Sequence, residues 1–566
     1  MVVMMYDDIA YDTQNPFPGQ VFNAPGGLDV YDGVRIDYRG PDVNSATFLA
    51  VLEGNASAVP PGNHTGRVLA SGPYDRIFVF YSDHGSPGVL GMPSGSFLYA
   101  DQLVGALQRK YDKGSYKEAV LYIEACESGS LFEGGLLPAR ISAYATTASN
   151  AFESSWATYC PGMVPGPSPL FSTCLGDLYS VAWMENAQLC DLREETLMTQ
   201  YDIVRNRTSR NFTYSMGSHV MQYGNLVISR EVAGDYQGMR NRGRGKGDPG
   251  TAGESAACRP GPGPRPGPKP SPSPSPWPSP SPSYRAGALR GVGSAATQAV
   301  AALGGSNAGG GGGGRRQATE EAAEAATAAA AAAADPAHSQ GRQAHSLEQR
   351  DADLAPLRHR IRSGATPEDR REAQAALDRE LGRRRAVDSA ALSAATGLLR
   401  DYPQLVVTVA AAAALNTAKL AAALVNAAAT AAAATATAAR PLEGVGVAGN
   451  AVVLAMLSRE LVHGPMGRPA PGRPLVDDWD CLRAMVAAWA DVCGPMDQYA
   501  MRHTRLLANL CNAGVAPALL ADALRRGGAE AGPGPGGCGS GGDGGGGGDG
   551  GGSGGEGGGD DGLPPS

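Results

Sequence analysis

The sequence predicts an α/β protein with a mostly parallel sheet, and two observations carry that prediction. Within residues 1–238, short runs of β-branched and aromatic residues alternate with segments of helical periodicity. The runs that we expect to form strands are residues 2–6, 77–82, 119–125 and 141–146. Between the middle two, Leu103, Ala106 and Leu107 lie at helical spacing, and Gly114 follows as a helix end. The middle two strands and this helix are therefore expected to form a parallel βαβ unit.

The composition limits how much of the chain can fold. Of 566 residues, 79 are Gly and 42 are Pro, and they are concentrated in tracts. Such tracts bury too little apolar surface to offset the entropy of ordering them. The formal net charge is −8, and no basic stripe lies on the segments of ordinary composition, so no nucleic-acid partner is expected.

After residue 238 the chain changes character several times. We expect a globular domain at 1–238, a low-complexity Pro/Gly/Ala linker at 239–344, a first helical part at 345–400, an Ala-rich insertion at 401–474, a second helical part at 475–526 and a disordered Gly-rich tail at 527–566. In the first helical part, Leu354, Leu357 and Ile361 share one helical face, and Ala373 and Leu377 indicate a second helix.

An Ala-dominated stretch at residues 405–440 raises the question of a membrane span. Alanine contributes little to membrane insertion, and Lys419 lies in the middle of the stretch. No membrane span is therefore expected.

Chemistry-bearing residues directly follow the two central strands of the βαβ unit. His84 follows the strand at 77–82, and Cys126 follows the strand at 119–125. Because the carboxyl ends of adjacent parallel strands meet at one edge of the sheet, the imidazole and the thiol should lie side by side. A thiol next to a base is a potential nucleophile, and the Gly85 backbone could approach a substrate closely. The alternative is that Cys126 is a buried small apolar residue and His84 belongs to an ordinary loop.

Several longer motifs decide between these interpretations. Those in the first domain are VMMYDDI (3–9), YSDHG (81–85), YIEACESGS (122–130), YATTASN (144–150) and SHVMQYG (218–224). Those in the helical parts are HSLEQRDADL (345–354), VDDWDCL (476–482) and ANLCNAG (508–514). Together they resemble the legumains, or vacuolar processing enzymes, in their plant form. The resemblance implies a caspase-like three-layer α/β/α peptidase domain followed by an α-helical prodomain.

The resemblance also implies the roles of individual residues. Cys126 would be the nucleophile, His84 the general base and acid, and the Gly85 backbone part of the oxyanion hole. The specificity pocket for the Asn side chain of the substrate would be formed by Glu124, Asp177, Ser154 and Ser155. Neither a metal ion nor a cofactor is implied.

Cysteines and sequons add expectations about processing. By resemblance, Cys160 and Cys174 should form a disulfide, and Cys481 and Cys511 should be disulfide-bonded cysteines of the prodomain; Cys493 lacks a clear partner, and Cys190, Cys258 and Cys538 have no assigned role. Four N-x-S/T sequons mark possible glycosylation at Asn55, Asn63, Asn206 and Asn211. These features favour the secretory pathway and a vacuole or lysosome-like compartment.

The start of the chain departs from this pattern. Residues 1–5 carry no basic region and no long apolar stretch, so no signal peptide is recognised. The resemblance places a further strand, with an Asn and an Arg of the site, before the strand at 2–6. That strand would lie beside residues 77–82, so we expect a gap in the sheet there.

The resulting hypothesis is a cysteine endopeptidase that cleaves protein and peptide substrates after Asn, and after Asp at acid pH, through a thioester. Its own C-terminal prodomain would inhibit it and leave in acid, with Arg358, Arg360 and Arg362 as basic partners of Glu124 and Asp177. Asn307 in the linker would be a site of self-cleavage. Two alternatives stay open: an inactive binding module with the protease fold, and a peptide ligase of the same family.

Overall fold

The computed structural model describes residues 1–6, 9–13, 15–209, 217–238, 346–416, 451–466 and 473–530. The expectations for the low-complexity linker, for the middle of the Ala-rich insertion and for nearly all of the Gly-rich tail lie outside the described residues. So do those for Asn211, Asn307, Cys258 and Cys538.

A four-stranded sheet forms the centre of the first domain. Its strands are β1 (Arg76–Ser82), β5 (Glu118–Glu124), β6 (Ala143–Thr147) and β9 (Met221–Gly224), in the order β1-β5-β6-β9. The first three are parallel, and β9 runs antiparallel to β6. Helix α2 (Ala100–Asp112) connects β1 to β5, so the mostly parallel sheet and its βαβ unit are confirmed.

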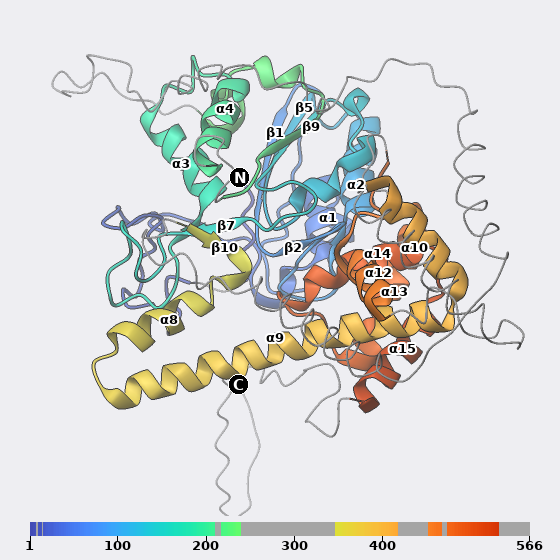
Figure 1. The fold of residues 1–566 in the computed structure, drawn as a ribbon. Helices are drawn as coiled ribbons and strands as arrows, with labels where there is room; N and C mark the ends of the chain where they lie inside the picture. The colour runs from blue at the N-terminus through green and yellow to red at the C-terminus, as the bar shows by residue number, and fades with distance from the viewer. Residues whose placement is uncertain are drawn as a thin grey trace, which may run out of the picture.

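Helices cover both faces of this sheet (Figure 1). On one face, Leu121 and Ile123 of β5 pack in a common core with α2 and with α1 (Ser45–Glu53). On the other face, Val120 and Tyr122 pack against α3 (Leu178–Leu189) and α4 (Leu197–Thr208). Successive residues of β5 thus enter opposite cores, as the period of two of a strand requires. The α/β/α layering is confirmed.

The expected strand at residues 2–6 is not formed, which corrects the sequence analysis. Met4 makes only an isolated parallel bridge with Tyr38, and Met5 N donates to Tyr38 O at 3.1 Å. This segment instead lines a cavity of about 850 Å³ through Met1, Val2, Met4, Met5 and Tyr6, and the β1 residues from Phe78 to Ser82 line it as well. Strand propensity at 2–6 is therefore not matched by a paired strand beside it in the described part of the chain. The cavity lies beside β1, where a gap was expected.

Two small antiparallel sheets flank the carboxyl edge of the main sheet. One consists of β2 (Gly85–Ser86), β3 (Val89–Leu90) and β4 (Leu98–Tyr99) and follows β1 directly. The other has the order β10-β7-β8, with β7 (Trp156–Thr158), β8 (Gly176–Asp177) and β10 (Ser346–Glu348). Strand β10 comes from the C-terminal half, so that half adds a strand to the first domain.

The C-terminal half is helical, as expected. Its helices are α8 (Leu354–Ser363), α9 (Pro367–Asp401), α10 (Pro403–Asn416), α12 (Ala451–His463), α13 (Trp479–Cys493), α14 (Thr504–Asn512) and α15 (Pro517–Glu530). Figure 1 shows α9 running past the helices labelled α12 to α15, with α8 and β10 at its other end. Leu405, Val409 and Leu457 are buried in the same core as Leu398 and Trp489. The boundary expected at residue 401 therefore does not separate two structural units.

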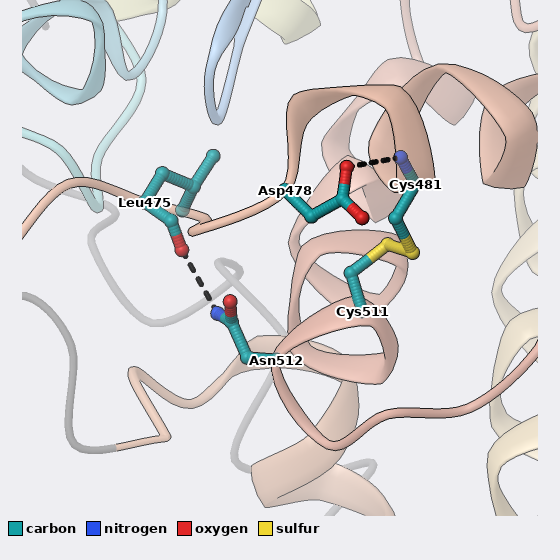
Figure 2. The surroundings of a disulfide bond; sticks show 5 residues. All are labelled: Leu475, Asp478, Cys481, Cys511 and Asn512. Atoms are coloured by element: carbon teal, nitrogen blue, oxygen red, sulfur yellow. Dashed lines mark hydrogen bonds between the residues drawn. A yellow bond between two sulfur atoms is a disulfide. The ribbon is translucent and has the colours of Figure 1, made fainter.

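Disulfides join neighbouring elements of both halves. Cys160 pairs with Cys174, and Cys481 pairs with Cys511, so that the start of α13 is tied to α14 (Figure 2). Asp478 caps α13 by accepting a hydrogen bond from Cys481 N at 2.9 Å. Cys190 and Cys493 are disulfide-bonded as well, whereas the free cysteine of the described residues is Cys126. None of the described helices is both long and apolar enough to cross a membrane.

Candidate active site

The register between β1 and β5 places His84 and Cys126 at matching positions. Ser82 pairs with Glu124 at the ends of the two strands, and Asp83 N donates to Glu124 O at 3.3 Å. His84 and Cys126 each come two residues after that last pair. The imidazole and the thiol thus belong to loops that leave the same sheet edge side by side, as the strand-end argument requires.

Gly85 lets these two loops touch. A Cβ atom at this position would lie 2.5 Å from Cys126 O and 2.6 Å from Ala125 Cβ, which no side chain tolerates. The preceding residue is held by its carbonyl, because His84 O accepts from Gly91 N at 2.7 Å and from the Tyr81 hydroxyl at 3.2 Å. The glycine backbone therefore lies directly against the nucleophile loop.

Cys126 is covered in this structure. Its side chain is 2 % exposed, its Sγ lies 3.6 Å from Ser155 Oγ, and its thiol points to Gln349 Oε1 at 3.8 Å. Burial raises the pKa of Cys126 to about 11, although the nearby Arg350 guanidinium favours the thiolate. The thiol of the covered protein is therefore protonated at neutral pH.

The loop after Cys126 is tightly fixed. Glu127 adopts a φ of 45°, which is uncommon for a residue other than Gly, and a 3-10 turn over Ser128–Leu131 follows. Ser149 Oγ accepts a hydrogen bond from Ser128 N at 3.1 Å and donates to Ala125 O at 3.0 Å. Such fixation holds the thiol in place before any substrate arrives.

Two acids lie close to Cys126, and no cation pairs with either of them among the described residues. Oε2 of Glu124 accepts from the backbone N and the Oγ of Ser180, both at 2.8 Å, but its Oε1 is buried and has no hydrogen-bond partner. Burial raises the pKa of Glu124 well above its usual range, and the charge of Asp177 raises it further. Burial also raises the pKa of Asp177 to about 7. Ser155 lies next to this acid pair and lowers the pKa of Glu124, and its hydroxyl is 3.6 Å from the Cys126 Sγ.

Ser154, the fourth residue expected in the specificity pocket, contacts the C-terminal half instead. Its Oγ accepts a hydrogen bond from Arg350 Nη1 at 3.1 Å. The structure thus brings Glu124, Ser155 and Asp177 together, whereas Ser154 contacts Arg350.

A segment of the C-terminal half crosses the site as an added strand. In the antiparallel pairing of β10 with β7, Glu348 lies opposite Trp156 (Figure 1). Gln349 N then donates to Ser155 O at 2.8 Å, and its side chain reaches the Cys126 thiol. An extended peptide bound to a sheet edge is the usual way in which a protease holds a substrate strand.

Arg350 fixes this segment next to the nucleophile. Its guanidinium donates to both carboxylate oxygens of Glu127, at 2.9 and 2.8 Å, and to Gly85 O at 2.9 Å. The Arg350 side chain is 7 % exposed, so the ion pair is shielded from water. Bidentate arginine–carboxylate pairs in such surroundings are among the stronger polar contacts in proteins. We call Arg350 together with Glu127 the latch.

The latch corrects the expected charge partners of the prodomain. Arg358 pairs with Asp351 at 3.8 Å and Arg360 with Asp369 at 2.6 Å, while Arg362 is exposed on α8. These arginines lie beyond the segment that crosses the site, so they do not reach Glu124 or Asp177. Arg350 belongs to the HSLEQRDADL motif, and its position in that motif was the available signal.

The described sequons differ in their surroundings. Asn55 and Asn63 lie in connecting segments, and Asn63 is exposed. Asn206 lies within α4, and the threonine of its sequon, Thr208, is buried with its hydroxyl donating to Val204 O at 2.8 Å. Glycosylation stays a prediction, and Asn63 is its most accessible described position.

Comparison with known proteins gives a consistent family. Residues 1–239 match the Peptidase C13 family, and residues 465–526 match the legumain prodomain. A vacuolar-processing enzyme beta-isozyme of Arabidopsis thaliana is 36 % identical over 523 residues, which are 92 % of this chain and 77 % of that relative. The chain belongs to the legumain family.

Two further relatives show how the likeness is distributed. A legumain of Canavalia ensiformis is 34 % identical over 537 residues, covering 94 % of this chain and 82 % of the relative. A vacuolar-processing enzyme of Citrus sinensis is 55 % identical over 238 residues, which are 42 % of this chain. The matched residues make up 47 %, or about half, of the length of the Citrus sinensis relative.

Proposed function

We propose that this chain is a cysteine endopeptidase that cleaves after asparagine and is held latent by its own C-terminal helices. The observation that carries the proposal is the placement of His84 and Cys126 at matching ends of two paired parallel strands. Membership of the legumain family supports the same activity. The relatives' names further support an acidic vacuolar or lysosome-like compartment as the place of action.

The proposed reaction proceeds through a thioester. His84 takes the proton of Cys126, and the thiolate attacks the carbonyl carbon of the scissile bond. The oxyanion that forms is stabilised by the backbone N–H groups of Gly85 and Cys126, which lie against each other. His84 then gives its proton to the leaving amine as the C–N bond breaks. Water, deprotonated by His84, attacks the thioester, and the thiol is restored.

The acid pair next to Cys126 suits an asparagine side chain. An asparagine amide offers two N–H donors and one carbonyl acceptor, and the unpartnered Oε1 of Glu124 is an acceptor for one N–H. Because burial raises the pKa of Glu124 and Asp177, the pocket is not strongly charged in acid and can receive an uncharged group. A substrate Asp becomes uncharged near its own pKa of about 4, so cleavage after Asp should increase as the pH falls.

Latency follows from two features of the covered site. Strand β10 and Gln349 take the edge of β7 that an extended substrate would use, and burial keeps the thiol protonated. Departure of the C-terminal helices would expose the edge and admit water to the thiol. The desolvation that raises the pKa of Cys126 would then be removed, and His84 could act as its base.

The activity is tested on the full chain after incubation at pH 4–5. Cys126→Ala should lower cleavage of an Asn-containing fluorogenic peptide by at least about a thousandfold, as removal of a catalytic nucleophile does in other proteases. Ser168→Ala, on an exposed loop, serves as the matched control and should leave the rate unchanged. Equal rates for the Cys126 variant and the parent chain would refute the assignment, and a cleavage profile dominated by Lys, Arg or apolar residues would refute the pocket.

A further inference from the structure

A second cavity lies between the first domain and the C-terminal helices, next to the latch. Its volume is about 620 Å³. One wall is formed by residues of the first domain, among them Glu153 and Trp156, and the opposite wall by residues of α9, α12, α14 and the segment after β10. The cavity is therefore present only while the C-terminal helices cover the first domain.

The walls of this cavity carry an excess of arginine. Six arginines line it, namely Arg350, Arg358, Arg384, Arg385, Arg502 and Arg505. Five carboxylates line it as well, namely Glu127, Glu153, Glu348, Asp351 and Asp388. Four of these carboxylates have a basic partner within 4 Å, because Glu127 pairs with Arg350, Asp351 with Arg384, Glu153 with His219 and Asp388 with His503.

Three of the arginines have no carboxylate within 4 Å in the described part of the chain. Arg385 is exposed on α9, and Arg502 donates to the Tyr499 hydroxyl at 2.9 Å. Arg505 is buried, donates to Ala151 O, and stacks on Phe152 with 4.5 Å between guanidinium carbon and ring centroid. Among the described residues that line the cavity, Glu348 is the one carboxylate without a cation within 4 Å, so three unpaired cations face one unpaired anion. A buried guanidinium without a counterion is costly, so the cavity favours an added anion.

Arg350, at the edge of the same cavity, has one donor that no described residue accepts from. Both of its terminal nitrogens are used, but its Nε has no hydrogen-bond partner among the described residues. This Nε has almost no accessible surface, so an anion in the cavity would not contact it. The charge balance of the arginines, and not this donor, therefore favours an anion.

We propose that this cavity binds a small molecule carrying two or more phosphate groups. Guanidinium groups match the oxygens of phosphates and carboxylates in a planar, two-pronged geometry, and an oligophosphate brings several negative charges to the unpaired arginines. The volume lies within the range of roughly 300–1,000 Å³ that small-molecule sites occupy, and it exceeds what one phosphate ion fills. Arg385 and Arg502 come from the C-terminal helices, whereas Phe152 and Trp156 come from the first domain. The arginines would hold the ligand, and the first-domain residues would enclose it while the C-terminal helices cover that domain.

This site stands apart from the proposed peptidase activity, because it needs only the covered arrangement of the two halves. A bound oligophosphate should raise the melting temperature of the uncleaved chain, since a ligand that binds only the folded, covered state stabilises it. It should also slow release of the C-terminal helices in acid.

The test uses the purified full chain at pH 7 and constant ionic strength, with pyrophosphate and tripolyphosphate as probes. Isothermal titration and thermal melting should both show saturable binding, tightest for tripolyphosphate. Arg385→Ala and Arg502→Ala should each weaken binding at least about tenfold, the loss expected for one charge-assisted hydrogen bond. Arg371→Ala, an exposed arginine of α9 that does not line the cavity, should bind as the parent chain does.

Each remaining outcome decides against the site. Binding that is equal in the parent chain and in both cavity variants would place the anion elsewhere. An equal effect of sodium chloride at the same ionic strength would show a screening effect, and binding of succinate but not of pyrophosphate would contradict the ligand class. Because Arg385 is exposed, the Arg385→Ala variant should fold and show a normal melting transition.

Discussion

Two buried glutamates stand on either side of Cys126, and they differ in what faces them. Glu124 is 2 % exposed, and within the described residues it has no cation beside it and no hydrogen-bond partner for its Oε1. Glu127 is 8 % exposed and receives a bidentate contact from Arg350. Burial, together with the charge of Asp177, raises the pKa of Glu124, and we expect the resulting pocket to suit an uncharged amide. Burial with a guanidinium makes Glu127 one half of an ionic latch.

The difference shows how one loop can serve both recognition and latency. A carboxylate kept without a counterion is free to accept from a substrate, whereas one paired by the C-terminal half is available only after that half has left. The two glutamates should therefore respond differently to mutation.

The largest effect is expected from breaking the latch. Arg350→Ala leaves Glu127 buried without a partner, and removal of one member of a buried ion pair costs about 3–5 kcal/mol. The chain should then show peptidase activity at pH 7 without acid treatment, and limited proteolysis should release its C-terminal helices. The measurement is the rate of cleavage of an Asn-containing peptide at pH 7, which should be detectable for the variant and not for the parent chain.

Arg360→Ala is the matched control for the latch. Arg360 pairs with Asp369 and is 41 % exposed, so its loss should cost about 1 kcal/mol or less and leave latency unchanged. If Arg350→Ala stayed latent at pH 7 while folding normally, the latch would not be what holds the helices in place.

The second effect concerns the pocket and should leave latency untouched. Glu124→Gln keeps the shape and the acceptor for Ser180 N, but it can present an amide N–H₂ where Oε1 faces the pocket. A donor placed against the substrate's own N–H should lower kcat/KM for Asn peptides by about a hundredfold. Glu118→Gln, at the other end of β5, is the control and should have no effect on kcat/KM. Loss of latency in the Glu124 variant would contradict the separation of the two roles.

The sequence predicted that His84 and Cys126 lie side by side, but it did not predict the latch, and both outcomes depend on how local the contact is. His84 and Cys126 were placed by a local rule, because each directly follows a strand and neighbouring parallel strands end at one edge. Glu127 and Arg350 are 223 positions apart, and no periodicity or spacing links them. The sequence offers many arginines, and Arg358, Arg360 and Arg362 fitted the charge argument equally well. Only the β10–β7 pairing selects Arg350.

The other differences have similar causes. Residues 2–6 have strand propensity, but a strand forms only with a partner, and Met4 meets Tyr38 in a single bridge. The Ala-rich composition after residue 401 concealed Leu405 and Val409, which are buried against α9. Propensity and composition thus describe a segment, whereas pairing and burial depend on what surrounds it.

The third prediction concerns pH and the core beneath the latch. His503 is fully buried, stacks on Trp489, and hydrogen-bonds through Nε2 to Asp388 at 2.9 Å. Burial lowers the pKa of His503; the hydrogen bond and charge of Asp388 oppose this, and the charges of Arg502 and Arg350 add to it. His463 on α12 is the other titratable group that faces it, with 6.2 Å between the ring centroids.

The sign of the effect follows from that direction. A histidine whose pKa is lower in the folded protein than its unfolded value of about 6.5 destabilises the fold as the pH drops below 6.5. His503→Gln removes the group whose protonation destabilises the fold. Release of the C-terminal helices should then need a pH that is lower by about half a unit or more. Asp388 acts at a lower pH than His503. Its pKa is lowered in the folded protein, so the stability that it contributes is lost only below its unfolded pKa of about 4. Gel analysis of the chain incubated at a series of pH values gives the midpoint of helix release. A midpoint in His503→Gln that equals or exceeds that of the parent chain would show that His503 does not promote release in acid.

The smallest effect separates general weakening of the helices from specific loss of the latch. Thr366 caps α9 by accepting a hydrogen bond from Asp369 N at 3.0 Å, and it contacts neither glutamate. Thr366→Ala should cost about 1 kcal/mol, the usual value of such a cap, and lower the thermal stability of the C-terminal half slightly. Thr366→Ser retains the hydroxyl and is the control. Because α9 is also held by its core contacts, the Thr366→Ala chain should stay inactive at pH 7 and should release its helices in acid only slightly earlier than the parent chain. Activation at pH 7 comparable to that of Arg350→Ala would mean that any loss of helix stability frees the site, and the contrast between a paired and an unpaired glutamate would then lose its explanatory role.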